Sequence, residues 1–417
     1  MSKSGLNDSA DSKAQSDLDA EHPKSASLDK EAKTTQSPSA TDQPSTDDYS
    51  ASGGLVARLA SLNISLALTS YQSGLLYLIG RNKENGINIH QTALPKPMGL
   101  CLDTRIQQEA DAVATDKFET GIPATGGLTL TGGYQIMRFE NTLQPNQWVN
   151  ETFDACYVPR TVHVTGTLDA HDVGLDDQGQ PVFVNTRFNC LARTSKRHSF
   201  EVIWKPPFIT DIVDEDRCHL NGLAMENGKT RYVTAISRSN TIDGWRDRRS
   251  NGGVVIDVQS NEIVCTGLSM PHSPRLHNGR LWLHNSGTGQ LGVVEFDTAG
   301  KGSFVPKVFC PGFLRGLAFH GNFAFVGLSK PRYKRFEGLA LDQKLKDADA
   351  EPWCGVQIID LTSNSCVDWF RIDGTIGEVY DLEVLPNCTT PMAVPPHSNE
   401  AAQLVTYDGM PSAAAQT

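Results

Sequence analysis

The chain has 417 residues, of which 39% are hydrophobic and 20% charged, so it carries enough apolar material for a large folded core. Its formal net charge of −11 disfavours a general nucleic-acid or anionic-membrane surface, because like charges repel. It contains no apolar run of about 18 residues, and its N-terminus lacks an apolar signal segment, so we expect neither a membrane span nor secretion.

Residues 1–52 contain mainly Ser, Asp, Lys, Ala, Thr and Gln, with almost no large apolar side chains. Such a segment cannot bury enough apolar surface to offset the entropy that it would lose on ordering, so we expect a disordered tail. We interpret this tail as a solubilising leader, with a specific docking role as the alternative. Residues 395–417 are similar but less charged, and we expect a flexible C-terminal tail there.

A degenerate repeat fills residues 53–394. Each copy has a short segment of alternating apolar character, a tight polar or glycine turn, and a second strand that ends in small polar residues. The copies begin at Met98, His171, Asn221, Ser273, Arg315 and Tyr380. These anchors lie roughly 40 to 75 residues apart, which is close to the length of four strands with their turns and some insertions.

The last copy, YDLEVLPN from Tyr380, provides a first strand, but the sequence that follows does not supply the other strands of a blade. An orphan set of strands at residues 65–93 precedes the first anchor. If these N-terminal outer strands pair with the C-terminal inner strand, the ring closes and no open sheet edge is left. We therefore predict an all-β protein, a six-bladed β-propeller over residues 53–394, with a two-sheet sandwich as the alternative.

The start of each innermost strand in a propeller lies at the mouth of the central channel, and the loop after the second strand opens on the same face. Polar residues recur at both places, so we predict a concave ligand site there. The alternative is that these residues are polar only because they face channel water. The predicted ligand-binding residues are Asp172, Asn185, Arg187, His219, Asn221, Ser273, Arg275, Arg315, Lys330, Glu378 and Tyr380. A second ring of strand-end residues, Thr186, Ser286 and Ser329 among them, is predicted to face the same pocket.

Metal motifs are scarce, since neither H-E-x-x-H nor C-x-x-C occurs, and a closed zinc site is therefore disfavoured. Oxygen atoms of Asp172, Asn221 and Asp381 could hold a hard divalent cation such as calcium, and this alternative stays open. The chain also lacks a G-x-S-x-G elbow and a P-loop.

Its nine cysteines are odd in number and scattered, which indicates free thiols in a reducing compartment and a cytoplasmic location.

Two basic loops, GWRDRRSNGG at residues 244–253 and KPRYKRF at residues 330–336, could reach over the channel. Arg246 or Arg332 could then hold an anion, with solvated loop tips as the alternative. Trp204 and Trp245 could stack on a ligand, although aromatic residues in a propeller more commonly pack between blades.

In strings such as RCHLNGLAM, GLSMPHSPRLHNGRLW and PGFLRGLAFHGNFAFVGLSK, the chain resembles an uncharacterised bacterial family of conserved hypothetical proteins, domain of unknown function 4915. The resemblance covers most of residues 60–390 and implies a propeller domain without an established activity. More distantly, the NGLA strand start is similar to that of gluconolactonase and senescence-marker propellers, whose metal-binding Asn corresponds to Asn221. Those enzymes have an Asp at the start of the following blade, whereas this chain has His272 and Ser273. The departure weakens the case for a cation, and Arg315 favours a bound carboxylate, phosphate or sulfate at least equally.

Three functions are consistent with these observations. The first is binding of a small polar or anionic ligand without chemistry. The second is a hydrolase, lactonase or lyase with His171 or His272 as general base and Arg315 stabilising negative charge. In that enzyme, Asp172 or Asp381 would orient the base or hold a cation, so His171, His272 and Asp381 are the candidate catalytic residues. The third is a platform for a protein partner, which the polar character of the expected face disfavours.

Overall fold

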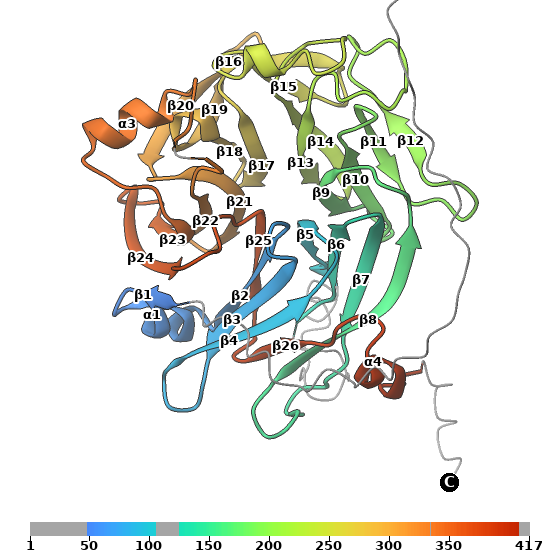
Figure 1. Ribbon diagram of the computed structural model, residues 1–417, viewed down its shortest axis with the longest axis vertical. Coiled ribbons are helices and arrows are strands. Elements are labelled where there is room, and N and C mark those ends of the chain that lie inside the picture. Colours follow the sequence, from blue (N-terminus) through green and yellow to red (C-terminus); the bar gives the residue numbers. More distant parts are fainter. Residues whose placement is uncertain (1–47, 106–124, 334, 408–417) are drawn as a thin grey trace, which may run out of the picture. The chain divides into compact units, whose positions relative to one another are not determined.

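Six sheets surround a common axis in the computed structural model, which describes residues 48–105, 125–333 and 335–407 (Figure 1). This part of the chain is a six-bladed β-propeller, so the predicted fold is confirmed. Predictions for residues 1–47 and 408–417 lie outside the described residues. Within the described ranges, no helix is long and apolar enough to cross a membrane.

Each blade consists of four main strands, which follow one another from the channel outward. The first contains β5 (Pro97–Leu102), β6 (Leu128–Gly132), β7 (Gln135–Asn141) and β8 (Ala155–Val164). The second contains β9 (Ala170–Leu175), β10 (Pro181–Asn185), β11 (Cys190–Arg193) and β12 (Glu201–Trp204). The third contains β13 (Leu220–Glu226), β14 (Lys229–Ala235), β15 (Gly253–Asp257) and β16 (Glu262–Leu268).

The fourth blade contains β17 (Pro271–His277), β18 (Arg280–Asn285), β19 (Gln290–Phe296) and β20 (Gly302–Phe309). The fifth contains β21 (Phe313–His320), β22 (Phe323–Ser329), β23 (Cys354–Asp360) and β24 (Ser365–Ile372). The sixth contains β25 (Asp381–Pro386), β2 (Ile64–Ser70), β3 (Leu75–Arg81) and β4 (Ile87–Ala93). Short helical segments lie outside the blades: α1 (Leu55–Leu62), η1 (Arg246–Arg248), η2 (Ser286–Thr288), α3 (Leu341–Asp347) and α4 (Asn399–Gln403).

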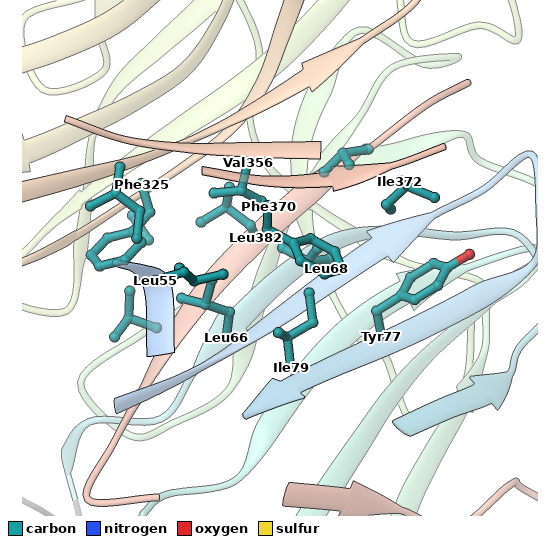
Figure 2. Packing of buried hydrophobic residues seen from close by; sticks show 14 of the residues in the cluster. Leu55, Leu66, Leu68, Tyr77, Ile79, Phe325, Val356, Phe370, Ile372 and Leu382 are labelled. Atoms are coloured by element: carbon teal, nitrogen blue, oxygen red, sulfur yellow. The ribbon is translucent and has the colours of Figure 1, made fainter. Parts of the chain in front are cut away.

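The ring closes in the predicted way. Strand β25 pairs antiparallel with β2, with Thr69 opposite Asp381 and Ile64 opposite Pro386. On its other flanks, β25 contacts the inner strands β21 and β5 of the two neighbouring blades. A large hydrophobic cluster fills the space between the closing blade and the fifth blade, and it includes Leu55 of α1, Leu68 of β2 and Phe370 of β24 (Figure 2). Segments that are far apart in the sequence are thus joined both by the backbone hydrogen bonds between β2 and β25 and by packing of apolar side chains.

Blades are also joined by hydroxyl groups at the ends of their second strands. Thr186 Oγ1 donates to the Leu220 carbonyl at 2.7 Å, and Ser286 Oγ donates to the Leu314 carbonyl at 2.7 Å. Three more donate in the same way across blade boundaries, namely Thr69 to Met98, Thr131 to Ala170 and Ser329 to Val379. The sequence predicts that such strand-end hydroxyls face a ligand. In the structure they satisfy backbone carbonyls where one inner strand meets the next.

The folded part extends beyond the predicted limits of residues 53 and 394 on both sides. Strand β1 (Tyr49–Ala51) pairs with β24, and β26 (Pro391–Ala393) runs parallel to β8, ahead of helix α4. The composition of the N-terminal segment concealed β1, because only Tyr49 and Ala51 of this three-residue edge strand pack on the core, with the Tyr49 ring stacked on Phe370 at 5.7 Å between centroids. Next to it, Ser52 Oγ donates to Asp368 Oδ1 at 2.8 Å, and Arg58 Nε lies 3.1 Å from Asp368 Oδ2.

Removal of residues 1–52 is expected to lower the thermal unfolding midpoint by about 2 to 5 °C. The truncated protein loses the ladder between β1 and β24 as well as the Ser52 hydrogen bond to the buried carboxylate of Asp368. Differential scanning calorimetry would measure the shift. Removal of residues 1–46 leaves β1 in place and is the matched control, so equal midpoints for the two truncated proteins would contradict a stabilising role for β1.

Candidate functional site

A pocket of about 820 Å³ opens at the mouth of the central channel. All six blades contribute to its wall at or just before their inner strands, through Met98, His171, His219, Met270, Arg315 and Tyr380. The pocket therefore lies where the sequence predicts it, because radial sheets bring the starts of their inner strands to one axial opening.

The two basic loops form the upper wall of this pocket. The loop between β14 and β15 contributes Trp245 and Arg246, and the loop between β22 and β23 contributes Arg332 and Tyr333. The loops contact each other, since Ser250 Oγ donates to the Gly338 carbonyl at 3.1 Å. Their predicted placement over the channel is confirmed. Trp204 lies elsewhere, and its Nε1 donates to Asn261 Oδ1 at 2.7 Å.

Arg315 projects from β21 into the pocket, although the residue is only 9% exposed. Its guanidinium carbon lies 4.6 Å from the centre of the Tyr380 ring and 5.6 Å from that of Phe313. Within the described ranges, no side chain or carbonyl forms a hydrogen bond or ion pair with this guanidinium. Its donors are therefore available to a ligand, while the two rings hold the group in place.

Glu378 is a second buried ionisable residue in the same pocket. Its Oε2 accepts hydrogen bonds from Ser70 Oγ at 3.1 Å and from the Gln72 amide at 3.3 Å. Its Oε1 is buried without a partner in the described structure. Burial raises the pKa of Glu378 to about 7, while the nearby positive charge of Arg315 opposes that rise. This carboxyl group can therefore change its charge near neutral pH.

Two of the predicted catalytic residues, His171 and His272, are oriented by backbone carbonyls. His171 Nδ1 lies 2.6 Å from the Asp169 carbonyl, and His272 Nδ1 lies 2.8 Å from the Met270 carbonyl. A carbonyl can only accept, so Nδ1 carries the proton in both rings and Nε2 presents a lone pair. Burial lowers the pKa of both imidazoles well below its usual value, and repulsion from Arg315 adds to this. Both rings are therefore neutral at pH 7.

His219 differs from the other two because a carboxylate orients it. Its Nδ1 lies 2.6 Å from Asp216 Oδ2, and its ring stacks on Trp245 with centroids 4.1 Å apart. Its backbone adopts the left-handed conformation with a φ of 51°, which is uncommon outside glycine and is frequent at functional sites. Asp216 is not among the residues predicted from the sequence. The spacing D-x-x-H in DRCH is the signal that could have revealed it.

A small cavity of about 10 Å³ lies at the inner end of the site. Its wall contains the five residues on which the predicted convergence depends, namely His171, Asn221, His272, Arg315 and Asp381. The prediction that these distant parts of the sequence meet near the axis is therefore confirmed. A cavity of this size holds about one water molecule or one hydroxyl group.

Asp172, Arg275 and Asp381 form a buried ionic cluster, and none of the three lines the large pocket. Arg275 Nη1 lies 2.9 Å from Asp172 Oδ2, and Arg275 Nη2 lies 3.6 Å from Asp381 Oδ1. The carboxylates also bridge blades, because Asp172 accepts from the Leu223 amide and Asp381 from the Leu100 amide, both at 2.9 Å. The sequence predicts ligand or catalytic contacts for these residues. The three residues bind one another and the backbone of adjacent blades, while Asp172 and Asp381 also line the small inner cavity.

The predicted cation set of Asp172, Asn221 and Asp381 fits calcium poorly. Both carboxylates are bound to Arg275 and backbone amides, and Asn221 Oδ1 accepts from Thr234 Oγ1 at 2.7 Å. The described residues contain no group of three or more His, Cys, Asp or Glu side chains that could hold a metal ion. A cation here would have to displace Arg275 and would meet its positive charge.

Calcium at 5 mM, roughly the weak end of protein calcium affinities, is therefore expected to leave the unfolding midpoint within about 1 °C of that in EDTA. Magnesium in place of calcium serves as the control for ionic strength. A clear calcium-specific rise, measured by scanning fluorimetry, would restore the cation hypothesis.

Three other predicted residues have local partners. Asn185 is buried, and its Oδ1 accepts from the Phe188 amide at 3.2 Å in the turn after β10. Arg187 Nε lies 2.6 Å from Asp214 Oδ1, outside the pocket. Ser273 Oγ accepts from the Gly316 amide of the next blade at 3.0 Å. Lys330, His219, Glu378 and Tyr380 do line the pocket, as predicted. All nine cysteines are free thiols.

Fold and site together define a β-propeller protein with a polar pocket at the mouth of its central channel. Within that class, the chain belongs to the family described as "Domain of unknown function (DUF4915)", which matches residues 53–394. The family expected from the sequence is thereby confirmed. A comparison with curated proteins finds no match.

Several solved structures are similar to this chain at low sequence identity. A chain of the nidogen/laminin complex is 11% identical with a TM-score of 0.46, and the match covers 78% of this chain and 99% of that chain. Virginiamycin B lyase from Staphylococcus aureus is 11% identical with a TM-score of 0.36, over 73% of this chain and 90% of the lyase. A protein assigned as a gluconolactonase is 11% identical with a TM-score of 0.39, over 63% of this chain and 78% of its own.

Proposed function

We propose that this propeller binds a small anionic ligand in the channel-mouth pocket, with Arg315 as the principal anion-binding residue. The observation that carries the proposal is the buried guanidinium, which forms no direct ion pair or hydrogen bond with a carboxylate within the described ranges, although the charge of Glu378 acts on it from a greater distance. A buried charge is normally paired, because leaving it uncompensated costs several kcal/mol, on the order of the penalty for each buried ion. An anionic ligand would provide the missing partner through charge-assisted hydrogen bonds.

The charges around the pocket support the same proposal. The wall contains seven basic side chains, Lys96, Arg246, Arg249, Arg315, Lys330, Arg332 and Arg335. It contains five acidic side chains, Asp169, Asp216, Asp247, Glu337 and Glu378. Some charges of both signs are already paired, since Glu337 lies 3.2 Å from Arg335 and Arg246 lies 2.9 Å from Asp243, and the wall still keeps a basic excess. A protein with a net charge of −11 thus presents a basic pocket, which attracts anions.

Sulfate is a suitable probe, because its charge does not change between pH 6 and pH 8. Protonation of Glu378 below pH 7 removes the negative charge beside Arg315, so we expect sulfate to bind about tenfold tighter at pH 6 than at pH 8. Isothermal titration calorimetry at both pH values would measure this difference. Burial lowers the pKa of His171 well below its usual value, so we expect this imidazole to contribute little to the difference.

Glu378→Gln is expected to lose most of this pH dependence and to bind sulfate about as tightly at pH 8 as the unmodified protein does at pH 6. Glu337→Gln is the matched control, since that carboxylate is paired with Arg335 at the pocket rim. If the protein binds no sulfate at either pH, the pocket is not an anion site.

A hydrolase or lyase is the second candidate function. The observation that favours it is the pairing of His219 with Asp216 in the same pocket as Glu378, a carboxyl group whose pKa is about 7. Asp216 fixes the His219 tautomer so that Nε2 can act as a base, while protonated Glu378 can act as an acid. The base would then be His219, and Asp216 takes the orienting role that the sequence suggests for Asp172 or Asp381. Loss of turnover in both Asp216→Asn and His219→Gln, with normal turnover in Arg187→Ala, would support an enzyme.

A further inference from the structure

Hydrogen-bond acceptors without partners are gathered around Arg315. His272 Nε2 and Glu378 Oε1 are both buried and lack a partner within the described structure, and each residue is 5% exposed. His272 shares the small inner cavity with Arg315, and Glu378 shares the large pocket with it. The residues that carry these two unmet acceptors therefore each share a cavity with Arg315, whose guanidinium donors are also unmet within the described structure.

The chemical character of these atoms follows from their other contacts. His272 Nδ1 faces the Met270 carbonyl and so carries the proton, which leaves Nε2 as an acceptor. Glu378 already accepts two hydrogen bonds at Oε2, and above its pKa of about 7 the ionised Oε1 can only accept a hydrogen bond. A bare anion would satisfy Arg315 but would place further acceptor oxygens against these two atoms. The site therefore requires donors on the ligand as well as negative charge.

A hydroxyl group is the donor that fits this site. A protonated amine also donates, but it would lie beside Arg315 in a pocket with seven basic side chains. A hydroxyl is neutral, and its volume matches the inner cavity of about 10 Å³ beside His272. The large pocket, at about 820 Å³, leaves room for the rest of a small molecule.

We infer that the ligand is a hydroxylated anion, either a hydroxy acid or a hydroxylated phosphate monoester. Its anionic group binds Arg315, and its hydroxyl groups donate to His272 Nε2 and, where Glu378 is ionised, to Glu378 Oε1. This inference rests on the proposed anion-binding function and specifies the class of ligand.

Pairs of probes that differ only in their hydroxyl groups test the inference on the full-length protein. Lactate with propionate and gluconate with hexanoate are the carboxylate pairs, and glycerol 3-phosphate with propyl phosphate is the phosphate pair. Titration calorimetry at pH 8, where Glu378 is mostly ionised, is expected to show at least about tenfold tighter binding of the hydroxylated member of a pair, in the carboxylate or the phosphate series. The series that binds identifies the anionic group.

His272→Phe keeps a ring of similar size and removes the acceptor, so the preference for the hydroxylated member is expected to fall several-fold. If this variant does not fold, as judged by circular dichroism, Glu378→Met tests the second acceptor in the same way. Arg187→Ala, whose side chain lies outside the pocket, is expected to keep the full preference.

The possible failures are distinguishable. Equal affinities within every pair, with sulfate still bound, would overturn the hydroxylated ligand and leave the anion site intact, because water would then satisfy the two acceptors. Absence of binding by sulfate and by every probe would overturn the proposed function itself.

Discussion

Arg275→Ala is expected to lower the free energy of unfolding by about 3 to 5 kcal/mol, a loss typical of removing one partner from a buried ion pair. Arg275 is the cation of a buried cluster in which Asp172 and Asp381 lie 2.9 and 3.6 Å from its guanidinium nitrogens. Burial raises the pKa of Asp381 to about 7 and that of Glu383 to about 8, and Arg275 opposes both shifts. Its removal leaves these acidic groups near the axis without a counterion.

Urea denaturation at pH 7 measures this loss, and Arg280→Ala is the matched control because Arg280 begins β18 of the same blade and is exposed. The deficit is expected to shrink at pH 5. Carboxyl groups with raised pKa values bind more protons in the folded protein than in the unfolded chain, so their stabilising contribution is present at low pH and lost as the pH rises through about 7 to 8. Equal midpoints for the two variants at pH 7 would show that Arg275 is not the cluster's necessary counterion.

The fold was predictable because its signals are local and repeated. Alternating strands and Asn-Gly turns mark the hairpins, and Asn227 and Asn278 both have φ values of 50°, the left-handed conformation that such turns require. The closure of the ring was predictable from the number of strands in each copy. The segment from Tyr380 lacked partner strands, and residues 65–93 provided them. The short edge strand β1 escaped prediction because its stabilising partner, β24, lies more than 300 residues away in the sequence.

The site was only partly predictable, because the role of a polar residue at a strand start depends on the neighbouring blade. Asp172 and Asp381 occupy equivalent positions, directly after the pocket-lining His171 and Tyr380, and both accept a backbone amide of the next blade and face Arg275. Ser273, directly after His272, accepts the Gly316 amide in the same way. Arg275 itself lies only three residues after His272, but it turns toward the axial carboxylates below the pocket. Such pairings between blades leave no trace in the local sequence.

The sequence prediction missed Asp216 although its contact with His219 is local, whereas the burial of Glu378 depends on distant segments. Asp216 lies before β13 in a run of charged residues, and its contact with His219 distinguishes it from the other carboxylates there. Glu378 was predicted as a ligand contact. Its raised pKa, however, arises from burial beneath Ser70 and Gln72, which come from the opposite end of the chain. Local patterns carry no information about such burial.

Arg315→Ala is expected to weaken sulfate binding at pH 6 by about 10- to 100-fold, because charge-assisted hydrogen bonds to a guanidinium contribute roughly 1.5 to 3 kcal/mol. The stability of the ligand-free protein is expected to stay the same or to rise slightly, since the variant removes a buried charge that has no partner in the described structure. Arg187→Ala removes a guanidinium that is paired with Asp214 outside the pocket, and it is expected to bind sulfate normally.

Arg315→Lys separates charge from geometry in the same experiment. Lysine keeps the positive charge but lacks the planar fork that donates two parallel hydrogen bonds, so we expect it to recover only part of the lost affinity. Calorimetric titration of all four proteins, with urea denaturation of each in the absence of sulfate, gives the comparison. If Arg315→Ala binds sulfate normally, Arg315 is not the anion receptor. If the variant unfolds at a much lower urea concentration, Arg315 instead stabilises the packing of Tyr380 and Phe313.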